Sequence, residues 1–444
     1  MKIELKKHLE SLLDFTIDAG ADECDVILSK GDSFSLSAQN GEIEKYKVSG
    51  SQVIGVRAIA NSRVGISYSE SLDFDSLKFA AKAAVENARN SEENPYEKIT
   101  VKKGEHIISS PFKKDESLIE EKIDFCLKLE SEVKKNDSRV QAVPYNGLSE
   151  STSSSYYLNS NKVFGYQDEY FLSCFTSALL KEGSENSMHY KGMIGRKLTD
   201  LNIDYCVNES LKHASQWLKG SALKTGFYDI VFTTDTFTEF LGTFSNIFSA
   251  KSAMEKTNPF AEKLNDQVAN SKVTITDCPQ FKDAFFQNYF DSEGNAHKDL
   301  TLIENGVLKS FYHNSATANY FKTTSTGNAA RGARSALGVG GTVKVMSSGE
   351  LTDHELLSGE YFEIHSIQGM RSGANSISGD FSFAATGYLC RNGEIISAVK
   401  GVTVSGNFHK MLLDIKLIGD TILSNNDKSF FAPRLRFEGI SVAG

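Results

Sequence analysis

The first 220 residues combine helical and strand-like patterns of hydrophobic and polar positions. Residues 3–19 place leucines at helical spacing on one face, and Gly20 provides a stop signal. Residues 24–69 then alternate apolar and polar positions around an Asn40-Gly41 pair, which is typical of a tight hairpin turn. The pattern predicts a helix followed by an antiparallel meander.

The remainder of this half repeats the same two patterns. Apolar residues recur at helical spacing in three more segments, and strand-like runs lie between the second and third of them. We expect helices near 72–88, 116–135 and 198–219, a polar connector at 91–114, and strands within 139–195 that turn at Asn146-Gly147 and at 159–161.

The second half opens with a strand at 227–234 and a helix at 235–248, and continues as glycine-punctuated strands. Two further Asn-Gly pairs, at 305–306 and 392–393, predict hairpins. Antiparallel hairpins with helices and few regular βαβ units indicate an α+β fold, rich in antiparallel sheet with flanking helices. The change of texture near Gly220 predicts two domains, 1–220 and 221–444.

Composition excludes several classes of protein. The 444 residues are 40% hydrophobic and 24% charged, as in ordinary globular proteins. A net charge of −9 without a basic run argues against direct binding of nucleic acid. We find neither a secretory signal nor 18 uninterrupted apolar residues, so we expect a cytoplasmic protein that makes no membrane contact.

Cysteine and histidine spacing gives no local metal or redox motif. The six cysteines lie at least 32 residues apart, and scattered cysteines of this kind are more often small buried hydrophobes. The nearest two histidines are 11 residues apart, whereas a helical zinc motif needs a spacing of about three to five. We therefore expect no metal ligand in this chain.

Two glycine-rich segments are open to more than one interpretation. Residues 323–341 lack the lysine of a phosphate-binding loop, but Arg331 and Arg334 could clamp a carboxylate such as a peptide C-terminus, or could simply be solvated. Residues 369–395 contain small residues at a density that would let a peptide add to a sheet edge. Bulges and corners of a curved sheet would explain this second segment equally well.

The order of several motifs resembles the TldD/PmbA family, and most closely its PmbA (TldE) branch. The resemblance covers effectively the whole chain. It is carried by NGEIEKY at 40–46, GVRAI, YFDSEGNAHKDLTLIENGVLKSFYHN from 289, STGNA at 325–329, SGDFS at 378–382, GYLCRNGEI, VTVSGNFHKML at 402–412 and APRLRFEGISVAG.

The resemblance implies a cytosolic metallopeptidase system that trims or degrades peptides, historically called a modulator of DNA gyrase. It also implies a curved, barrel-like β structure in the C-terminal domain. The TldD-type subunit of such a system carries zinc on a helix with the motif His-Glu, three residues, His, and a C-terminal Cys. Here the corresponding stretch, 235–248, has threonine and phenylalanine residues in place of histidines although Glu239 is present, and 421–444 contains no Cys.

The resemblance therefore implies a metal-free subunit that pairs with a zinc-bearing TldD-like protein as a heterodimer, or with itself when isolated, and helps to hold the peptide. No residue of this chain is assigned a catalytic role. The alternatives are a stand-alone peptidase that uses Cys278 or Cys390, and a non-enzymatic protein-binding modulator. The residues expected to contact substrate or partner are Gly327, Asn328, Gly373, Asn375, Ser378, Gly379 and Asp380.

Overall fold

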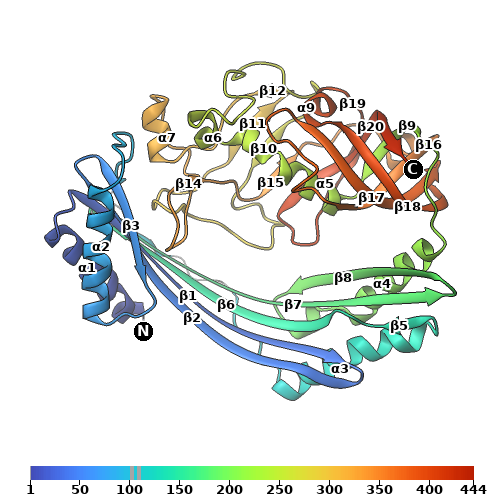
Figure 1. The fold of residues 1–444 in the computed structure, drawn as a ribbon, viewed down its shortest axis with the longest axis horizontal. Helices are drawn as coiled ribbons and strands as arrows, with labels where there is room; N and C mark the ends of the chain where they lie inside the picture. The colour runs from blue at the N-terminus through green and yellow to red at the C-terminus, as the bar shows by residue number, and fades with distance from the viewer. Residues whose placement is uncertain (1, 101–104, 108–111) are drawn as a thin grey trace.

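A computed structural model describes residues 2–100, 105–107 and 112–444. Two sheets lie one above the other, each with its own helices, and the expected α+β class is confirmed (Figure 1). Part of the predicted connector, 101–104 and 108–111, lies outside the described residues.

The first sheet has eight strands and curves beneath the C-terminal half (Figure 1). Its order is β3-β2-β1-β6-β7-β4, and β5 and β8 also pair with β7. The expected meander is confirmed, because β1, β2 and β3 are antiparallel neighbours, and Asn40 and Gly41 turn with φ of 57° and 79°. The strands are β1 (Glu23–Gln39), β2 (Glu42–Ala60), β3 (Arg63–Ser69), β4 (Glu105–Ile107), β5 (Val140–Ala142), β6 (Asn146–Asn159), β7 (Phe164–Glu182) and β8 (Glu185–Gly195).

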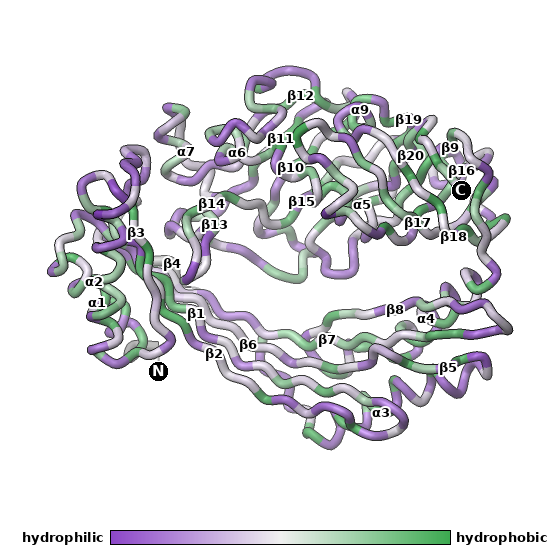
Figure 2. The backbone as a smooth tube through the Cα atoms, viewed as in Figure 1, coloured by the Kyte–Doolittle hydropathy of each residue, from purple (hydrophilic) through white to green (hydrophobic). Residues whose placement is uncertain are grey.

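Four helices cover the convex side of this sheet in two groups. α1 (Lys2–Asp18) and α2 (Phe74–Arg89) bury leucines and alanines against one end of it. α3 (Ile119–Asn136) and α4 (Ile203–Leu218) pack near the other end. The hydropathy of the chain follows this arrangement, because the hydrophobic stretches of β1–β3 lie beside α1 and α2 (Figure 2). All four predicted helices of the first half are present.

One predicted turn is wrong. Asn146 and Gly147 do not form a hairpin but begin β6, where Gly147 pairs with Phe175. The reason is packing, since a Cβ at Gly147 would lie 2.8 Å from the carbonyl oxygen of Leu36, and the buried Asn146 amide donates to the carbonyl of Cys126. Glycine is needed there for close approach between strands rather than for a turn.

The C-terminal half is built on a closed ring of five strands. β20 pairs with β18 and with β9, and β17 and β16 complete the circuit, which confirms the barrel-like expectation. The ring strands are β9 (Gly226–Phe232), β16 (Glu360–Gln368), β17 (Asp380–Arg391), β18 (Glu394–Asn407) and β20 (Phe430–Ala443). The same sheet continues through β15 (Lys344–Met346), β10 (Ile275–Asp277), β11 (Leu300–Glu304) and β12 (Val307–Leu308), and β19 (Ile415–Ser424) joins it by pairing with β20. β13 (Ala329–Ala330) and β14 (Gly338–Val339) form a separate sheet of two short strands.

Aromatic side chains fill the core of this half. α5 (Thr234–Thr243) buries Phe237 and Phe240, and Phe244 stacks on Phe408 with ring centroids 4.4 Å apart. The observed helix α5 is shorter than the predicted helix 235–248. It ends at Thr243 and tightens into a 3₁₀ turn, Ser245–Phe248, which directs Ile247 and Phe248 into the core. The smaller helices are α6 (Ala250–Met254), α7 (Ser315–Tyr320), α8 (Asp353–Leu356) and α9 (Phe408–Leu413).

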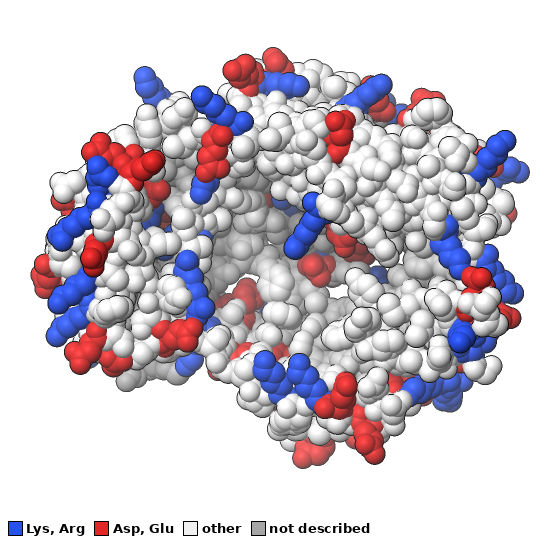
Figure 3. All heavy atoms as spheres, viewed as in Figure 1, with Lys and Arg blue, Asp and Glu red and all other residues white. Residues whose placement is uncertain are grey.

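The two halves touch closely at one end of the first sheet. A Cβ at Gly55 of β2 would overlap the carbonyl of Ala333, and one at Gly165 of β7 would lie 2.6 Å from the ring of Phe290. Between the halves the surface is hollowed (Figure 3). Across the described residues, no helix has the length and apolar character that a membrane span requires.

Candidate functional site

The α5 helix occupies the stretch where the resemblance places a zinc-binding helix. Counting from Glu239, the two histidine positions of that motif correspond to Thr238 and Thr243. Both hydroxyls donate to carbonyls of the same helix, Thr238 at 2.7 Å and Thr243 at 3.0 Å. In the part of the chain that the structure describes, no three His, Cys, Asp or Glu side chains converge as a metal site would require. The side chains of α5 do not fit a zinc ion.

Five of the seven predicted contact residues lie around one exposed loop before β17. The Asn375 side chain accepts from the backbone of Ser378, whose hydroxyl donates to Asp380 at 2.7 Å. Asn407 donates to the other oxygen of Asp380, and these hydrogen bonds hold its pKa below the usual value. A Cβ at Gly373 would overlap the carbonyl of Ser382. These contacts shape the loop itself, and the role of its residues in binding stays a prediction.

The other two predicted residues, Gly327 and Asn328, lie in a separate part of the C-terminal half. Gly327 has a φ of 75°, and a Cβ there would approach the carbonyl of Ala296 to 2.8 Å. The buried Asn328 amide donates to Asp277 and to the carbonyl of Gly340, while its Oδ1 has no hydrogen-bond partner. Their binding role also stays a prediction, but Ala329 and Ala330, which follow them, line a cavity.

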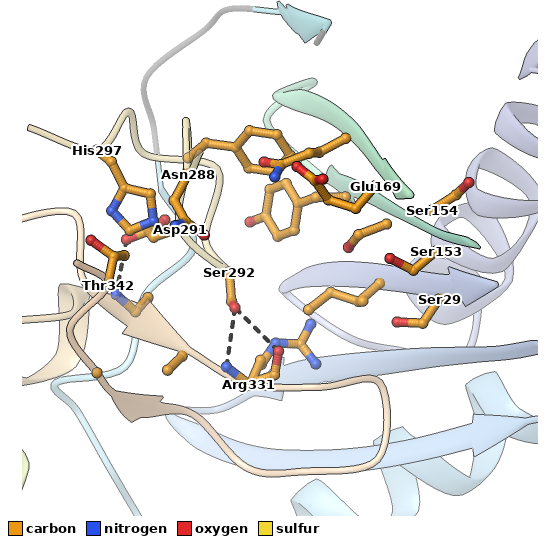
Figure 4. Close-up of a pocket in the computed structure, with 18 of the residues that line it drawn as sticks. Ser29, Ser153, Ser154, Glu169, Asn288, Asp291, Ser292, His297, Arg331 and Thr342 are labelled. Atoms are coloured by element: carbon orange, nitrogen blue, oxygen red, sulfur yellow. Dashed lines mark hydrogen bonds between the residues drawn. The ribbon is translucent and has the colours of Figure 1, made fainter. Parts of the chain in front are cut away.

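This cavity, of about 480 Å³, lies between the two halves. One wall comes from β1, β6 and β7, and the other comes from segments 288–297 and 329–342 (Figure 4). Its volume falls in the range of small-ligand sites. The side chains that characterise it are Ser29, Ser153, Ser155, Tyr157, Gln167, Glu169, Asn288, Asp291, Ser292, His297, Arg331 and Thr342.

Next to the cavity a buried cluster of charges joins the two halves. Arg57 of β2 contacts three carboxylates, at 2.6 Å (Asp25), 3.1 Å (Glu97) and 3.2 Å (Glu293), and Arg331 also binds Asp25. Burial alone would raise the pKa of Asp25, but the two arginines hold it below its usual value. At Glu97 burial prevails and raises the pKa. Asp25 and Arg57 belong to the N-terminal half, whereas Glu293 and Arg331 come from the C-terminal half, so the cluster ties them together.

Arg331 uses only part of its hydrogen-bonding capacity. Its Nη2 donates to Asp25, whereas its buried Nε and Nη1 have no partner. The side chain is 1% exposed and extends from the C-terminal half toward β1 (Figure 4). The second arginine of the segment, Arg334, is exposed and pairs with Glu70. The structure therefore separates these two arginines, and they do not form the joint clamp that was one interpretation of the sequence.

A carboxyl group and an imidazole stand on the same wall of the cavity. Asp291 accepts from the backbone of Glu293, Asn295 and Ala329, yet burial and the charge of Glu293 raise its pKa to about 7. Burial lowers the pKa of His297 to about 4, so its ring is neutral at pH 7. The Nδ1 atom of His297 is buried without a hydrogen-bond partner. A neutral imidazole with an unpaired nitrogen and a carboxyl group with a pKa of about 7 thus line the same cavity.

The sequence had signals for part of this cluster. Arg57 interrupts the apolar run VIGVRAIA, and Asp25 adjoins another apolar stretch, so each is a charge within a largely apolar run. Such residues need a buried partner of opposite charge. The identity of those partners did not follow, because Asp25 and Arg331 are 306 positions apart.

A second group of polar side chains joins the halves at α4 and was not predicted. The His213 ring lies 4.8 Å from that of His189 and 5.0 Å from that of His365, measured between centroids. Its Nδ1 is 2.5 Å from the hydroxyl of Tyr388, and Trp217 packs beside it. Burial lowers the pKa of His189 to about 3 and that of His213 to about 4, so both are neutral at pH 7.

The two cysteines considered as nucleophiles have the wrong electrostatics for that role. Burial raises the pKa of Cys278 and of Cys390 to about 11, whereas a reactive cysteine needs a lowered pKa. Five of the six cysteines are buried, and Cys278 is half-buried. The interpretation of the cysteines as buried small hydrophobes is confirmed for those five.

Comparison with known families decides the identity. Three consecutive family models match the chain: the PmbA/TldA metallopeptidase domain 1 at 24–88, the central domain at 113–216 and the C-terminal domain at 225–444. The chain belongs to the PmbA/TldD family. Within this family it is 24% identical to a metalloprotease PmbA homolog of Haemophilus influenzae, covering 94% of this chain and 92% of the relative. It is 22% identical to metalloprotease PmbA of Escherichia coli O157:H7, covering 98% of this chain and 97% of the relative.

Solved structures of other proteins share the fold of this chain. A proposed modulator of a DNA gyrase from Thermotoga maritima superposes with a TM-score of 0.87 at 24% identity, over 99% of this chain and all of the other. TldE from Thermococcus kodakarensis gives a TM-score of 0.81 at 20% identity, over 98% of this chain and 100% of the other. At these identities the likeness establishes the fold alone.

Proposed function

We propose that this PmbA/TldD protein is the metal-free, PmbA/TldE-type subunit of a cytoplasmic two-component peptidase that processes or degrades peptides. In this proposal the zinc ion and its ligands belong to a TldD-like partner. The present chain completes the cavity of the heterodimer and helps to hold the peptide.

The side chains of α5 carry the proposal. A catalytic zinc site needs three protein ligands and an open position for water or substrate. Thr238 and Thr243 offer neutral hydroxyls that are already bonded to their own helix, and Glu239 lies between them. Membership of a metallopeptidase family supports proteolysis by the assembly, while this helix supports a non-catalytic role for this chain.

Mixing experiments test the proposal. We expect the purified chain to hold much less than one zinc per molecule by elemental analysis and to leave a quenched-fluorescence peptide mixture intact. A TldD-like protein from the same genome should then form a heterodimer with it, seen by light scattering, and cleavage should appear in the mixture. Stoichiometric zinc together with peptidase activity in the isolated chain would contradict the proposal.

A matched variant separates this role from an unrecognised active site. In the mixture, Glu239→Gln should leave cleavage within about twofold of the parent, because Glu239 has no metal to serve here. A loss of a hundredfold or more would assign a catalytic function to α5. The alternative of a non-enzymatic modulator would gain support from a heterodimer without cleavage of any peptide.

A further inference from the structure

The cavity between the halves contains more unused hydrogen-bonding capacity than a closed structural interface requires. Most buried polar groups in folded proteins find partners, so an unpaired one calls for an explanation. Here Arg331 leaves Nε and Nη1 unpaired, and His297 leaves Nδ1 unpaired. Both residues line the same cavity.

The unpaired groups include Arg331, a cation whose one ion-pair partner among the described residues is Asp25. Asp25 is the acidic partner of Arg331, and Asp25 is already shared with Arg57. The acidic residue Glu169 on the opposite wall is engaged elsewhere, 3.0 Å from Arg196. An unpaired guanidinium N–H can donate a charge-assisted hydrogen bond to a carboxylate oxygen.

A row of small hydroxyl side chains leads away from this cavity. Directly opposed residues of neighbouring strands share one face of a sheet, and β1 opposes β6 through Ser29–Ser155, Ser33–Ser151 and Ser35–Ser149. Ser29 and Ser155 belong to the cavity lining, so the serine face begins there and extends along the two strands. Such a face can donate and accept hydrogen bonds along an extended backbone and places few steric demands on its side chains.

From these contacts we infer that the cavity binds the C-terminal carboxylate of a peptide at Arg331, with the preceding residues lying along the serine face of β1 and β6. The inference rests on the proposed peptide-holding function and deepens it. The neutral His297 ring, with its free nitrogen, can accept a hydrogen bond from a backbone N–H of the same peptide.

Binding of paired peptide mixtures to the full-length chain tests this inference. The probes are hexapeptides randomised at all positions, one preparation with free C-terminal carboxylates and one C-terminally amidated, with retained peptide measured by mass spectrometry after rapid filtration. A buried charge-assisted hydrogen bond predicts that the acid form binds about 10- to 100-fold more tightly than the amide. Equal retention of the two forms, or retention of neither, would overturn the inference.

Variants of the chain test whether the preference for the acid form arises at Arg331 and in the cavity. Arg331→Gln should abolish the preference for the acid form, whereas Arg334→Gln, at the exposed neighbour, should preserve it. Because Arg331→Gln also removes a partner of Asp25, Ser153→Leu provides a second variant that blocks the cavity without touching the charge cluster. Ser184→Leu, in an exposed turn, is its control. An acid preference that survives both Arg331→Gln and Ser153→Leu would place the carboxylate elsewhere.

Competition with a small carboxylate distinguishes a peptide ligand from a small-molecule ligand. N-acetylalanine should displace the acid hexapeptides only at concentrations at least about tenfold higher than those of the hexapeptides, because it lacks contacts with the serine face. Displacement at equal concentration would overturn the assignment of a peptide. The partner-dependent cleavage assay is separate, so equal binding of acid and amide peptides would refute the carboxylate site and leave the proposed subunit role standing.

Discussion

Replacement of Arg57 by leucine tests the charge cluster that joins the two halves. The Arg57 side chain is fully buried and contacts Asp25, Glu97 and Glu293. Removal of one partner from a buried ion pair typically costs about 3–5 kcal/mol, since the remaining charge stays desolvated. Arg331 still neutralises Asp25 in the variant. We therefore expect the free energy of unfolding to fall by about the cost of one broken ion pair, and not by the summed cost of several.

The size of the loss should depend on pH. Asp25 has a lowered pKa in the folded protein, so its contribution to stability is present above the unfolded pKa and is lost as the pH falls through the folded pKa. Without Arg57, Arg331 alone would oppose the effect of burial on Asp25, so the pKa of Asp25 would rise and less of this pH-dependent contribution would remain in the variant. The difference between parent and variant should therefore be largest near pH 7 and should narrow below about pH 4.

Guanidinium chloride unfolding, followed by circular dichroism and by fluorescence of the single tryptophan, measures both effects. Trp217 is buried and donates to the carbonyl of Gly387 in the other half, so its fluorescence reports on the contact between the halves. Arg391→Leu is the control, because Arg391 forms an exposed pair with Glu360 that should contribute about 1 kcal/mol or less. A loss below about 1 kcal/mol for Arg57→Leu at pH 7, or one that stays constant to pH 4, would refute the reasoning.

Three further outcomes can be measured directly. The Cβ added by Gly55→Ala would overlap Ala333, so this variant should loosen the contact between the halves and accelerate limited proteolysis. Its control is Gly242→Ala, at a helical position with open space, which should leave proteolysis unchanged and stabilise the protein by up to about 1 kcal/mol. Because the pKa of His189 is lowered to about 3 in the folded protein, only the unfolded chain gains a proton there as the pH drops from about 6.5, and stability should fall. His189→Phe should make this fall shallower in unfolding titrations. An unchanged slope would speak against this effect of burial on His189. With iodoacetamide at pH 8, the native chain should be modified slowly and first at Cys278, as read by mass spectrometry; rapid modification would reinstate it as a nucleophile.

Local sequence signals predicted most of the secondary structure. The Asn-Gly pairs at 40–41, 305–306 and 392–393 all turn with positive φ, because each stands between strands that the chain can fold back locally. The pair at 146–147 fails since its glycine serves close approach between strands, a requirement set by Leu36 more than 100 positions earlier. A dipeptide pattern cannot distinguish these two uses of glycine.

Long-range contacts account for what the sequence did not predict about the cavity. Arg331 was recognised as a possible carboxylate ligand, but its separation from Arg334 and its contact with Asp25 depend on how the two halves meet. His297 lies within a motif that carried the resemblance, yet its unpaired nitrogen emerges only from its buried environment. The serine face is visible only once the register of β1 and β6 is known.

The position of β20 in the ring has a consequence for synthesis of the protein. β20 follows in sequence every strand with which it pairs, namely β9, β15, β18 and β19. A nascent chain can thus complete its first sheet early, whereas β9 and β18 keep open edges until the ribosome has delivered β20. Exposed edges of this kind invite pairing with other chains. A premature stop before residue 430 should therefore yield a folded first sheet attached to an aggregation-prone remainder, and a cell would clear such fragments by proteolysis.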